Sequence, residues 1–281
     1  MRQLPVFFVR TLVLLLLFHA LAGNNVLYAQ YPHQNATEPH GNRLYFTQNK
    51  GQWQGNVLFQ SEIPAGRVFA EPLQLTFLCM NAAQLDEMHH RKHHPDESGT
   101  FTALQCHAFN IQFLNATPGL VEGGCPSPAY RNYFIGNDPK KWASFVPMFA
   151  EVNYRQLYQG IDLRLYSNPD DNALKYDFVL SPNANAAQIA LQYNGADSLR
   201  LLPDGSLQIV TSITTLIDQK PYAYQYINGQ EVAVPCMFQL SGNVLQFGFP
   251  SGYNPNFELI IDPSIVFSSF SGSFADNWGF T

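Results

Sequence analysis

Four histidines in one polar stretch have a spacing that could hold a metal ion. His89 and His93 are four residues apart, and so are His90 and His94. Two imidazoles at this spacing lie on one face of a helix, where zinc accepts them as ligands. The residues between the pairs are basic and would repel a cation, and the sequence fixes no acidic or cysteine ligand nearby. The alternative is a solvated loop whose histidines bind nothing.

Two aspartates on neighbouring predicted strands, Asp162 and Asp177, could act as a catalytic pair. Paired carboxylates hydrolyse glycosidic bonds when a cleft positions them. The alternative is a structural role, in capping a turn or in pairing with Arg164 and Lys175. The sequence contains no Gly-x-Ser-x-Gly, His-Glu-x-x-His or phosphate-loop pattern. We therefore predict that the protein is not an enzyme and uses no cofactor.

A polar turn at Asp170, Asp171 and Asn172 carries the oxygen ligands that calcium binds. This turn lacks the glycine and the glutamate of a standard calcium-binding loop. The sequence therefore predicts no metal site there.

Several aromatic side chains could stack on sugar rings at a binding surface. The candidates are Trp53, Trp142 and Tyr158, together with Tyr154 and Tyr166. Aromatic residues at strand spacing are more often part of a core, because each ring buries a large apolar area. The first interpretation predicts binding of a glycan or a host surface, and the second predicts no ligand.

The chain has four cysteines, and an even number in an exported protein allows three disulfide pairings. Cys79 and Cys106 lie on strands that flank one loop, but strand parity puts them on opposite faces. Free buried thiols are the alternative, because cysteine often serves as a small core residue. The remaining two are Cys125 and Cys236.

Residues 132–178 hold the densest run of aromatic residues and define the elements that position these candidates. In Ile161–Tyr166 and Leu174–Phe178, large apolar residues alternate with polar ones. This two-residue period is typical of strands that place one face on a core. Turn signals such as Gly136–Pro139 and Asn168–Asn172 separate the strands, because glycine and asparagine tolerate positive φ and proline fixes φ.

The same alternation recurs along the rest of the chain and predicts an all-β fold. An Asn-Gly pair at residues 228–229 predicts a tight hairpin turn. We expect two packed β-sandwich-like halves of short antiparallel strands, about 42–180 and 181–264. The other predicted strands are 44–46, 57–59, 67–70, 73–79, 104–114, 152–154, 189–194, 199–202, 206–210, 222–227, 230–234, 238–240, 244–247 and 257–261.

Two short helical segments interrupt this pattern. Asn81 is a capping residue for a helix through Gln84–Met88, which Pro95 would end. Asp138 similarly caps a single turn at Pro139–Trp142. Nothing else in the mature chain favours a long helix.

Residues 1–29 are predicted to form a signal-peptide helix. Two arginines precede an apolar run, Leu12–Leu17, that is shorter than the ~20 residues of a membrane span. Ala29 offers the small residue of a cleavage site. An uncleaved anchor helix is the alternative. A polar, flexible leader at 30–41 follows, and we expect an exported protein that acts at the cell surface or outside the cell.

Composition and hydropathy argue against a nucleic-acid-binding protein and against an integral membrane protein. The 281 residues carry a net charge of −6, whereas phosphate binding needs clustered lysine and arginine, so no nucleic-acid partner is expected. No stretch after the leader is long and apolar enough to cross a bilayer, which argues against an integral membrane protein.

Several motifs occur in an order that resembles a known domain family. In sequence they are Asn49–Trp53, Asn132–Asp138, Trp142, Tyr158–Leu163, Lys175–Phe178, Pro221–Gln225 and Ile260–Pro263. Together they resemble an uncharacterised N-terminal all-β domain, DUF7948-like, of exported proteins in Bacteroidota and some other bacteria. The resemblance covers residues 42–264.

The resemblance implies the context in which the domain works. In that family the domain precedes β-propeller-type SBBP repeats, PKD-like or Ig-like modules, and a C-terminal domain for type IX secretion or gliding-motility-associated display. Residues 265–281 are similar to the truncated start of such a repeat, with Ser271-Gly272 in place of the usual Gly-Gly. The expected partners are the downstream repeats. The expected function is a non-enzymatic module of a larger surface or adhesion protein, and the alternative is a glycan- or host-surface-binding module.

Overall fold

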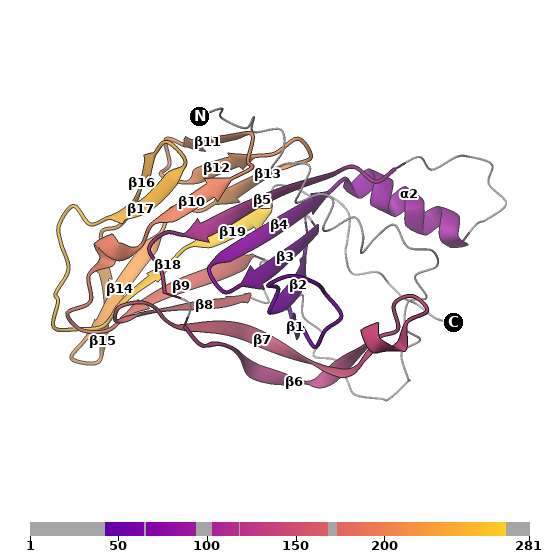
Figure 1. Cartoon of the computed structure of the whole chain (residues 1–281). Coiled ribbons are helices and arrows are strands. Elements are labelled where there is room, and N and C mark those ends of the chain that lie inside the picture. Colours follow the sequence, from indigo (N-terminus) through magenta and orange to yellow (C-terminus); the bar gives the residue numbers. More distant parts are fainter. Residues whose placement is uncertain (1–42, 65, 94–102, 118, 168–172, 268–281) are drawn as a thin grey trace, which may run out of the picture.

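The computed structural model describes residues 43–64, 66–93, 103–117, 119–167 and 173–267. The predicted signal peptide and leader, and residues 268–281 of the repeat-like segment, lie outside this range. Within it, strands dominate and every pairing between them is antiparallel, which confirms the predicted all-β, sandwich-like class (Figure 1).

The nineteen strands of the described residues form one connected sheet that branches at β7 (Ala143–Tyr158). β7 pairs with β6 (Val121–Tyr133), with β8 (Ile161–Ser167) and with β1 (Phe46–Gln48). From β1, successive pairings lead through β2 (Phe59–Ile63), β3 (Gly66–Glu71), β4 (Gln74–Met80), β5 (Cys106–Phe113), β10 (Leu191–Asn194), β17 (Val244–Gly248) and β16 (Met237–Ser241).

The pairings from β7 through β1 form one arm of the sheet. The second arm leaves β7 through β8 and divides at β9 (Leu174–Leu180). One edge of β9 is shared by two consecutive strands, β18 (Leu259–Asp262) and β19 (Ser264–Phe267). From β18 the sheet continues through β14 (Tyr222–Ile227) to β15 (Gln230–Val234). From β19 it continues through β13 (Thr215–Asp218) and β12 (Leu207–Val210) to β11 (Ser198–Leu201).

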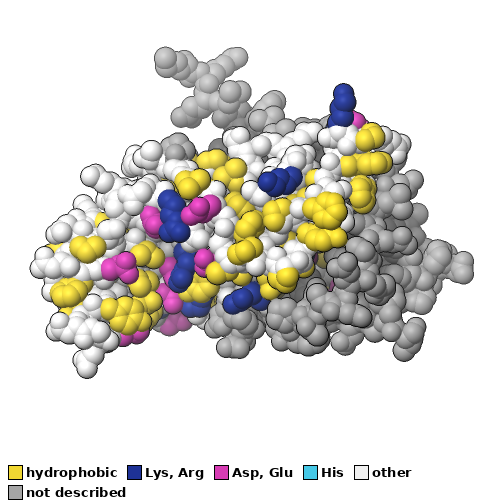
Figure 2. Space-filling view, turned by 90° about the horizontal axis from the view of Figure 1, so that it is seen from below, with side chains coloured by type: hydrophobic (Ala, Val, Ile, Leu, Met, Phe, Trp, Pro, Cys, Tyr) yellow, Lys and Arg dark blue, Asp and Glu magenta, His cyan; other side chains and the backbone are white. Residues whose placement is uncertain are grey.

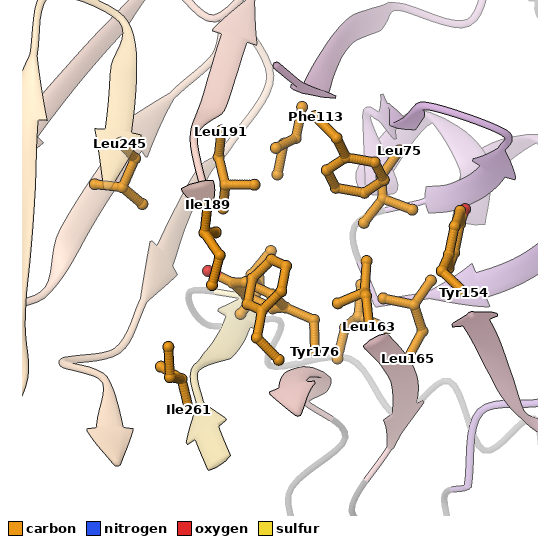
Figure 3. Close-up of a cluster of buried hydrophobic side chains, with 14 of the residues drawn as sticks. Leu75, Phe113, Tyr154, Leu163, Leu165, Tyr176, Ile189, Leu191, Leu245 and Ile261 are labelled. Atoms are coloured by element: carbon orange, nitrogen blue, oxygen red, sulfur yellow. The ribbon is translucent and has the colours of Figure 1, made fainter. Parts of the chain in front are cut away.

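The predicted halves, 42–180 and 181–264, are hydrogen-bonded to each other and share one core. β5 pairs with β10, and β9 pairs with both β18 and β19. A single cluster of buried apolar side chains draws on both halves, as Figure 3 shows for Leu75, Leu163, Leu191, Leu245 and Ile261. The inward residues of each strand supply this cluster because side chains alternate between the two faces.

The two predicted helical segments are present. Helix α2 (Ala82–His93) begins after Asn81, whose Oδ1 accepts from the Gln84 amide at 3.2 Å. The turn η1 (Pro139–Lys141) is capped by Asp138, whose Oδ1 accepts from the Lys140 amide at 3.1 Å. A second 3-10 turn is η2 (Ala186–Gln188), with Asn185 as its cap. Among the described residues, the helices are too short or too polar to cross a membrane.

Three strands were not predicted from the sequence: β6, β13 and β19. β6 is the most informative, because it pairs with β7 in a long two-stranded ribbon that runs along the bottom of Figure 1. Its glycines and prolines suggest turns rather than a strand. The prolines are tolerated because β6 is an edge strand, and its register shifts absorb the irregular residues.

Candidate functional site

The two aspartates that were considered as a catalytic pair, Asp162 and Asp177, lie on the outer face of the sheet. Asp162 on β8 is opposite Val179, and Asp177 on β9 is opposite Arg164. The two carboxylates therefore share a face and are diagonal neighbours across two strands. The outward side chains of β8 and β9 form a band of mixed charge, and Figure 2 shows charged groups of both signs gathered on this side of the molecule.

Asp162 stabilises an irregularity in the backbone of β7. Its Oδ1 accepts from the backbone N–H of Gln156 at 2.7 Å, and its Oδ2 accepts from Arg155 Nη1 at 3.2 Å. Gln156 has a φ of 52° and lies where the β7–β8 register shifts. The carboxylate therefore caps a β-bulge and neutralises an arginine, which is a structural role.

Asp177 is also occupied by cross-strand contacts. Arg164 Nη2 donates to its Oδ2 at 2.5 Å, and the Tyr166 hydroxyl donates to its Oδ1 at 3.1 Å. Burial raises the pKa of Asp177 to about 6, although the Arg164 hydrogen bond acts in the opposite direction. The predicted pairing with Arg164 is confirmed. The pairing of Lys175 is different: its Nζ donates to Asp262 at 2.9 Å.

Two of the aromatic candidates are wrong, because Tyr154 and Tyr158 belong to the core. Their exposed fractions are 1% and 3%, and their hydroxyls donate to the carbonyls of Glu71 and Ala190. Burial raises the pKa of Tyr158 to about 12. Neither ring can reach a ligand. Tyr166 faces outward, but the guanidinium of Arg164 lies 4.6 Å from its ring centroid.

The other two candidates lie near the far end of the β6–β7 ribbon. Trp53 is half-buried, and its ring packs edge-on against Tyr133 with centroids 5.5 Å apart. Trp142 is 44% exposed, its Nε1 donates to the Gly136 carbonyl, and its ring meets Phe134 edge-on at 5.5 Å. Trp142 therefore remains available to a ligand.

Two further exposed rings join Trp142 and Phe134 at this end of the ribbon. Tyr130 on β6 and Phe145 on β7 have centroids 4.8 Å apart and are 37% and 72% exposed. Phe145 has a φ of 54°, a conformation that is unfavourable for a bulky residue, and its amide donates to Asn132 Oδ1 at 2.9 Å. We call these four rings the ribbon tip.

The ribbon tip combines flat apolar rings with positive charge. Lys140 and Lys141 of η1 lie between Phe134 and Trp142 in the chain and are exposed. Backbone strain of the kind seen at Phe145 concentrates at functional sites, because the surrounding structure must hold it in place. Such a surface can stack on sugar rings and attract acidic substituents.

The four histidines that were considered as metal ligands lie only partly within the described residues. His89, His90 and His93 lie on helix α2, so the i,i+4 spacing of the first pair occurs on a helix as expected. His94 lies outside the described residues, as do Asp170, Asp171 and Asn172 of the calcium candidate. Within the described ranges, no group of three or more His, Cys, Asp or Glu side chains could hold a metal ion.

A histidine that the sequence analysis did not single out links three segments of the core. His107 on β5 is buried; its Nε2 donates to the Gly195 carbonyl at 2.7 Å, and its Nδ1 accepts from Ser212 Oγ at 2.8 Å. A carbonyl can only accept, so Nε2 carries the proton. A hydroxyl beside an imidazole resembles a nucleophile and its base, but here the pair ties two loops to β5.

A buried polar cluster also escaped the sequence analysis. Asp218 on β13 has no exposed surface, and the Tyr176 hydroxyl donates to its Oδ2. The buried Tyr193 hydroxyl also lies beside this carboxyl, and hydrogen bonds from Tyr176 and Tyr193 oppose the effect of burial on its pKa. Burial raises the pKa of Asp218 to about 7. The cluster joins strands from both halves of the chain.

All four cysteines are free thiols. Cys106 is opposite Met80 and Cys79 is opposite His107, so the two sulfurs lie on opposite faces of the sheet, as their parity predicted. Burial raises the pKa of Cys79 and of Cys236 to about 12, which keeps both as unreactive core thiols.

The comparisons with known proteins agree with the resemblance in the motifs. The model of a family described as a domain of unknown function, DUF7948, matches residues 46–264. The chain belongs to this family. No curated protein and no solved structure matches the chain. The DUF7948 match ends at Ser264, which is the first residue of β19, and the paired strand continues to Phe267.

Proposed function

We propose that this DUF7948 domain is a non-enzymatic module of a larger exported surface or adhesion protein. The observation that carries the proposal is the use of the ionisable groups on the outer face. Asp162 caps a bulge, and Asp177 and Asp262 pair with Arg164 and Lys175. Each of these carboxylates already has a hydrogen-bond or ion-pair partner within the sheet, whereas hydrolysis would need two carboxylates that face a substrate.

The position of β19 suits a module within a longer chain. β19 is hydrogen-bonded to β9 on one edge and to β13 on the other. A strand held on both edges ties whatever follows it directly to the centre of the sheet. The proposal places SBBP-type repeats and a type IX sorting domain after this strand, and the domain would cap the repeat array.

Deletion tests this role. The full-length protein is made with and without residues 30–264, and the solubility and protease resistance of the remaining chain are measured. If the domain caps the repeats, the deletion lowers both, because an unprotected sheet edge or apolar face aggregates. Equal solubility and equal protease resistance would reject the capping role.

A second candidate function is glycan binding at the ribbon tip. The observation that favours it is the exposure of four paired rings at one place, including the predicted candidate Trp142. A glycan array is probed with the wild-type domain and with Trp142→Ala. Met237→Ala is the matched control, because Met237 is 45% exposed elsewhere on the surface.

Loss of array binding in Trp142→Ala alone, with unchanged thermal unfolding, would support the glycan function. A wild-type domain that binds nothing on the array would count against it. Equal loss in the Met237→Ala control would show that the signal is non-specific apolar adhesion.

A further inference from the structure

We propose that the β14–β15 hairpin is a docking site for an extended basic peptide segment, at a surface separate from the ribbon tip. The hairpin lies at the lower left of Figure 1. Its outer face presents tyrosine rings beside a carboxylate, and its outer strand has an open edge. These features together suit a strand that carries arginine or lysine.

The first feature is a ladder of three tyrosines on one face of β14. Tyr222, Tyr224 and Tyr226 are spaced two residues apart, so their side chains point to the same side. Consecutive ring centroids are 5.5 Å and 5.6 Å apart. Tyr222 and Tyr226 are 45% and 53% exposed, which leaves ring surface for a ligand.

The second feature is the negative charge placed against these rings. Glu231 on β15 is opposite Tyr226, and its two oxygens accept from the hydroxyls of Tyr222 at 2.9 Å and Tyr226 at 3.3 Å. Both hydroxyl protons point at the carboxylate, so the assembly offers acceptors and ring faces to the solvent. Burial and the nearby Asp177 raise the pKa of Tyr224 to about 12, in keeping with a negative surface.

The molecule already contains a basic side chain held by this chemistry. On the same outer face, Arg164 lies over the Tyr166 ring at 4.6 Å and donates to Asp177 at 2.5 Å. A guanidinium between a tyrosine ring and a carboxylate gains both cation–π and ionic stabilisation. The exposed ladder with Glu231 repeats the ring and the carboxylate of that arrangement, and no arginine among the described residues is found over its rings.

The third feature is the free edge of β15. Among the described strand pairings, β15 is joined only to β14, and four of its five residues are exposed. Its interior contains no proline, unlike the edge strand β6. An edge of this kind accepts an added strand through main-chain hydrogen bonds, and the side chains beside it set the specificity.

The negative charge of this surface favours a basic partner over the alternatives. Glu231 would repel an acidic strand, and the protein has a net charge of −6, so a second copy of the chain is a poor partner. A neutral glycan could stack on the rings but would gain nothing from the strand edge. A basic extended peptide uses the rings, the carboxylate and the edge together.

Fluorescence anisotropy with labelled peptides tests the proposal on the full chain. The probe alternates arginine with threonine, and matched peptides replace arginine by glutamate or carry N-methyl groups on every peptide bond. We expect only the unmodified basic peptide to bind, and high salt to weaken it, because the charges are exposed. Binding of the glutamate peptide, or equal binding of the N-methylated peptide, would overturn the proposal.

Variants locate the site. Glu231→Gln should weaken binding by about fivefold, the effect of one exposed ion pair. Tyr226→Ala should weaken it by about as much through the lost cation–π contact. The matched controls Glu62→Gln and Tyr130→Ala remove the same groups from distant surfaces and should leave binding unchanged. Equal losses in controls and test variants, or no wild-type binding to the basic peptide, would reject this site, whatever the glycan array shows for the ribbon tip.

Discussion

At the scale of single residues, two carboxyl groups stand out because each is buried within the sheet. Asp218 lies in the core beside Tyr176 and Tyr193, and Asp177 lies beneath an arginine on the outer face. In both carboxyls burial is the largest cause of a raised pKa. A raised carboxyl pKa means that the folded state prefers the protonated form, so ionisation opposes folding.

The pH dependence of stability follows from this direction. The pKa of Asp218 is about 7 when folded and about 3.9 when unfolded. Its stabilising effect is complete below the unfolded pKa and is lost as pH rises through the folded pKa. Asp177, with a pKa of about 6, acts in the same direction. We expect the free energy of unfolding to fall between about pH 4 and pH 7.

The substitution Asp218→Asn isolates the larger contribution. The amide oxygen still accepts from the Tyr176 hydroxyl but does not ionise. Urea unfolding at pH 8 should show the variant more stable than wild type, by up to about 4 kcal/mol, with little difference at pH 4. A variant that is less stable than wild type at pH 8 would show that the ionised carboxylate is favourable in the core.

At the scale of elements, residue alternation predicted most strands and failed where backbone chemistry was unusual. The strands around Ile161–Tyr166 and Tyr222–Ile227 were found because their apolar residues alternate. β6 was missed because Gly123, Gly124 and Pro126 resemble turn residues, whereas here they lie in a bulged edge strand. Pattern alone does not distinguish these cases.

The same limit applies to the candidate site. Alternation shows which side chains share a face but not which face meets solvent, so Tyr158 was grouped with Trp142. The tip rings Tyr130 and Phe145 meet only because β6 pairs with β7. Asp162 was correctly placed on β8, but its capping of Gln156 depends on a register shift that sequence does not reveal.

Glycine in the β2–β3 hairpin gives a prediction for one element. Gly66 has a φ of 138°, and a Cβ there would lie 2.1 Å from the Leu78 carbonyl oxygen on β4. We expect Gly66→Ala to lower the free energy of unfolding by more than about 3 kcal/mol. Gly51→Ala is the matched control, since Gly51 has a φ of 107° with no atom within 4 Å of the added Cβ, and should cost about 1 kcal/mol. Equal costs would mean that β3 and β4 separate easily.

At the scale of the whole molecule, the two predicted halves depend on each other. β9 pairs with β18 and β19, and Phe178 on β9 packs against Phe247 on β17 with centroids 5.8 Å apart. Separation would expose the shared core and leave several strand edges unpaired. The fold therefore behaves as one unit even though its strands form two arms.

This mutual dependence predicts one cooperative unfolding transition. Calorimetry of the domain should give equal calorimetric and van't Hoff enthalpies, as expected of a two-state protein. The fragments 42–180 and 181–267, made separately, should lack stable tertiary structure by near-ultraviolet circular dichroism. Two resolved transitions, or a folded fragment, would contradict a shared core.

The most direct test of the central claim, that the outer-face carboxylates serve structure rather than catalysis, is the stability of Asp162→Ala. A bulge cap predicts a loss of about 2 kcal/mol in the free energy of unfolding at pH 7, because Gln156 and Arg155 lose their acceptor. Glu62→Ala, at an exposed ion pair with Arg131, should change little. An Asp162→Ala variant as stable as wild type, or more stable, would contradict the claim, because that is the behaviour of an active-site residue.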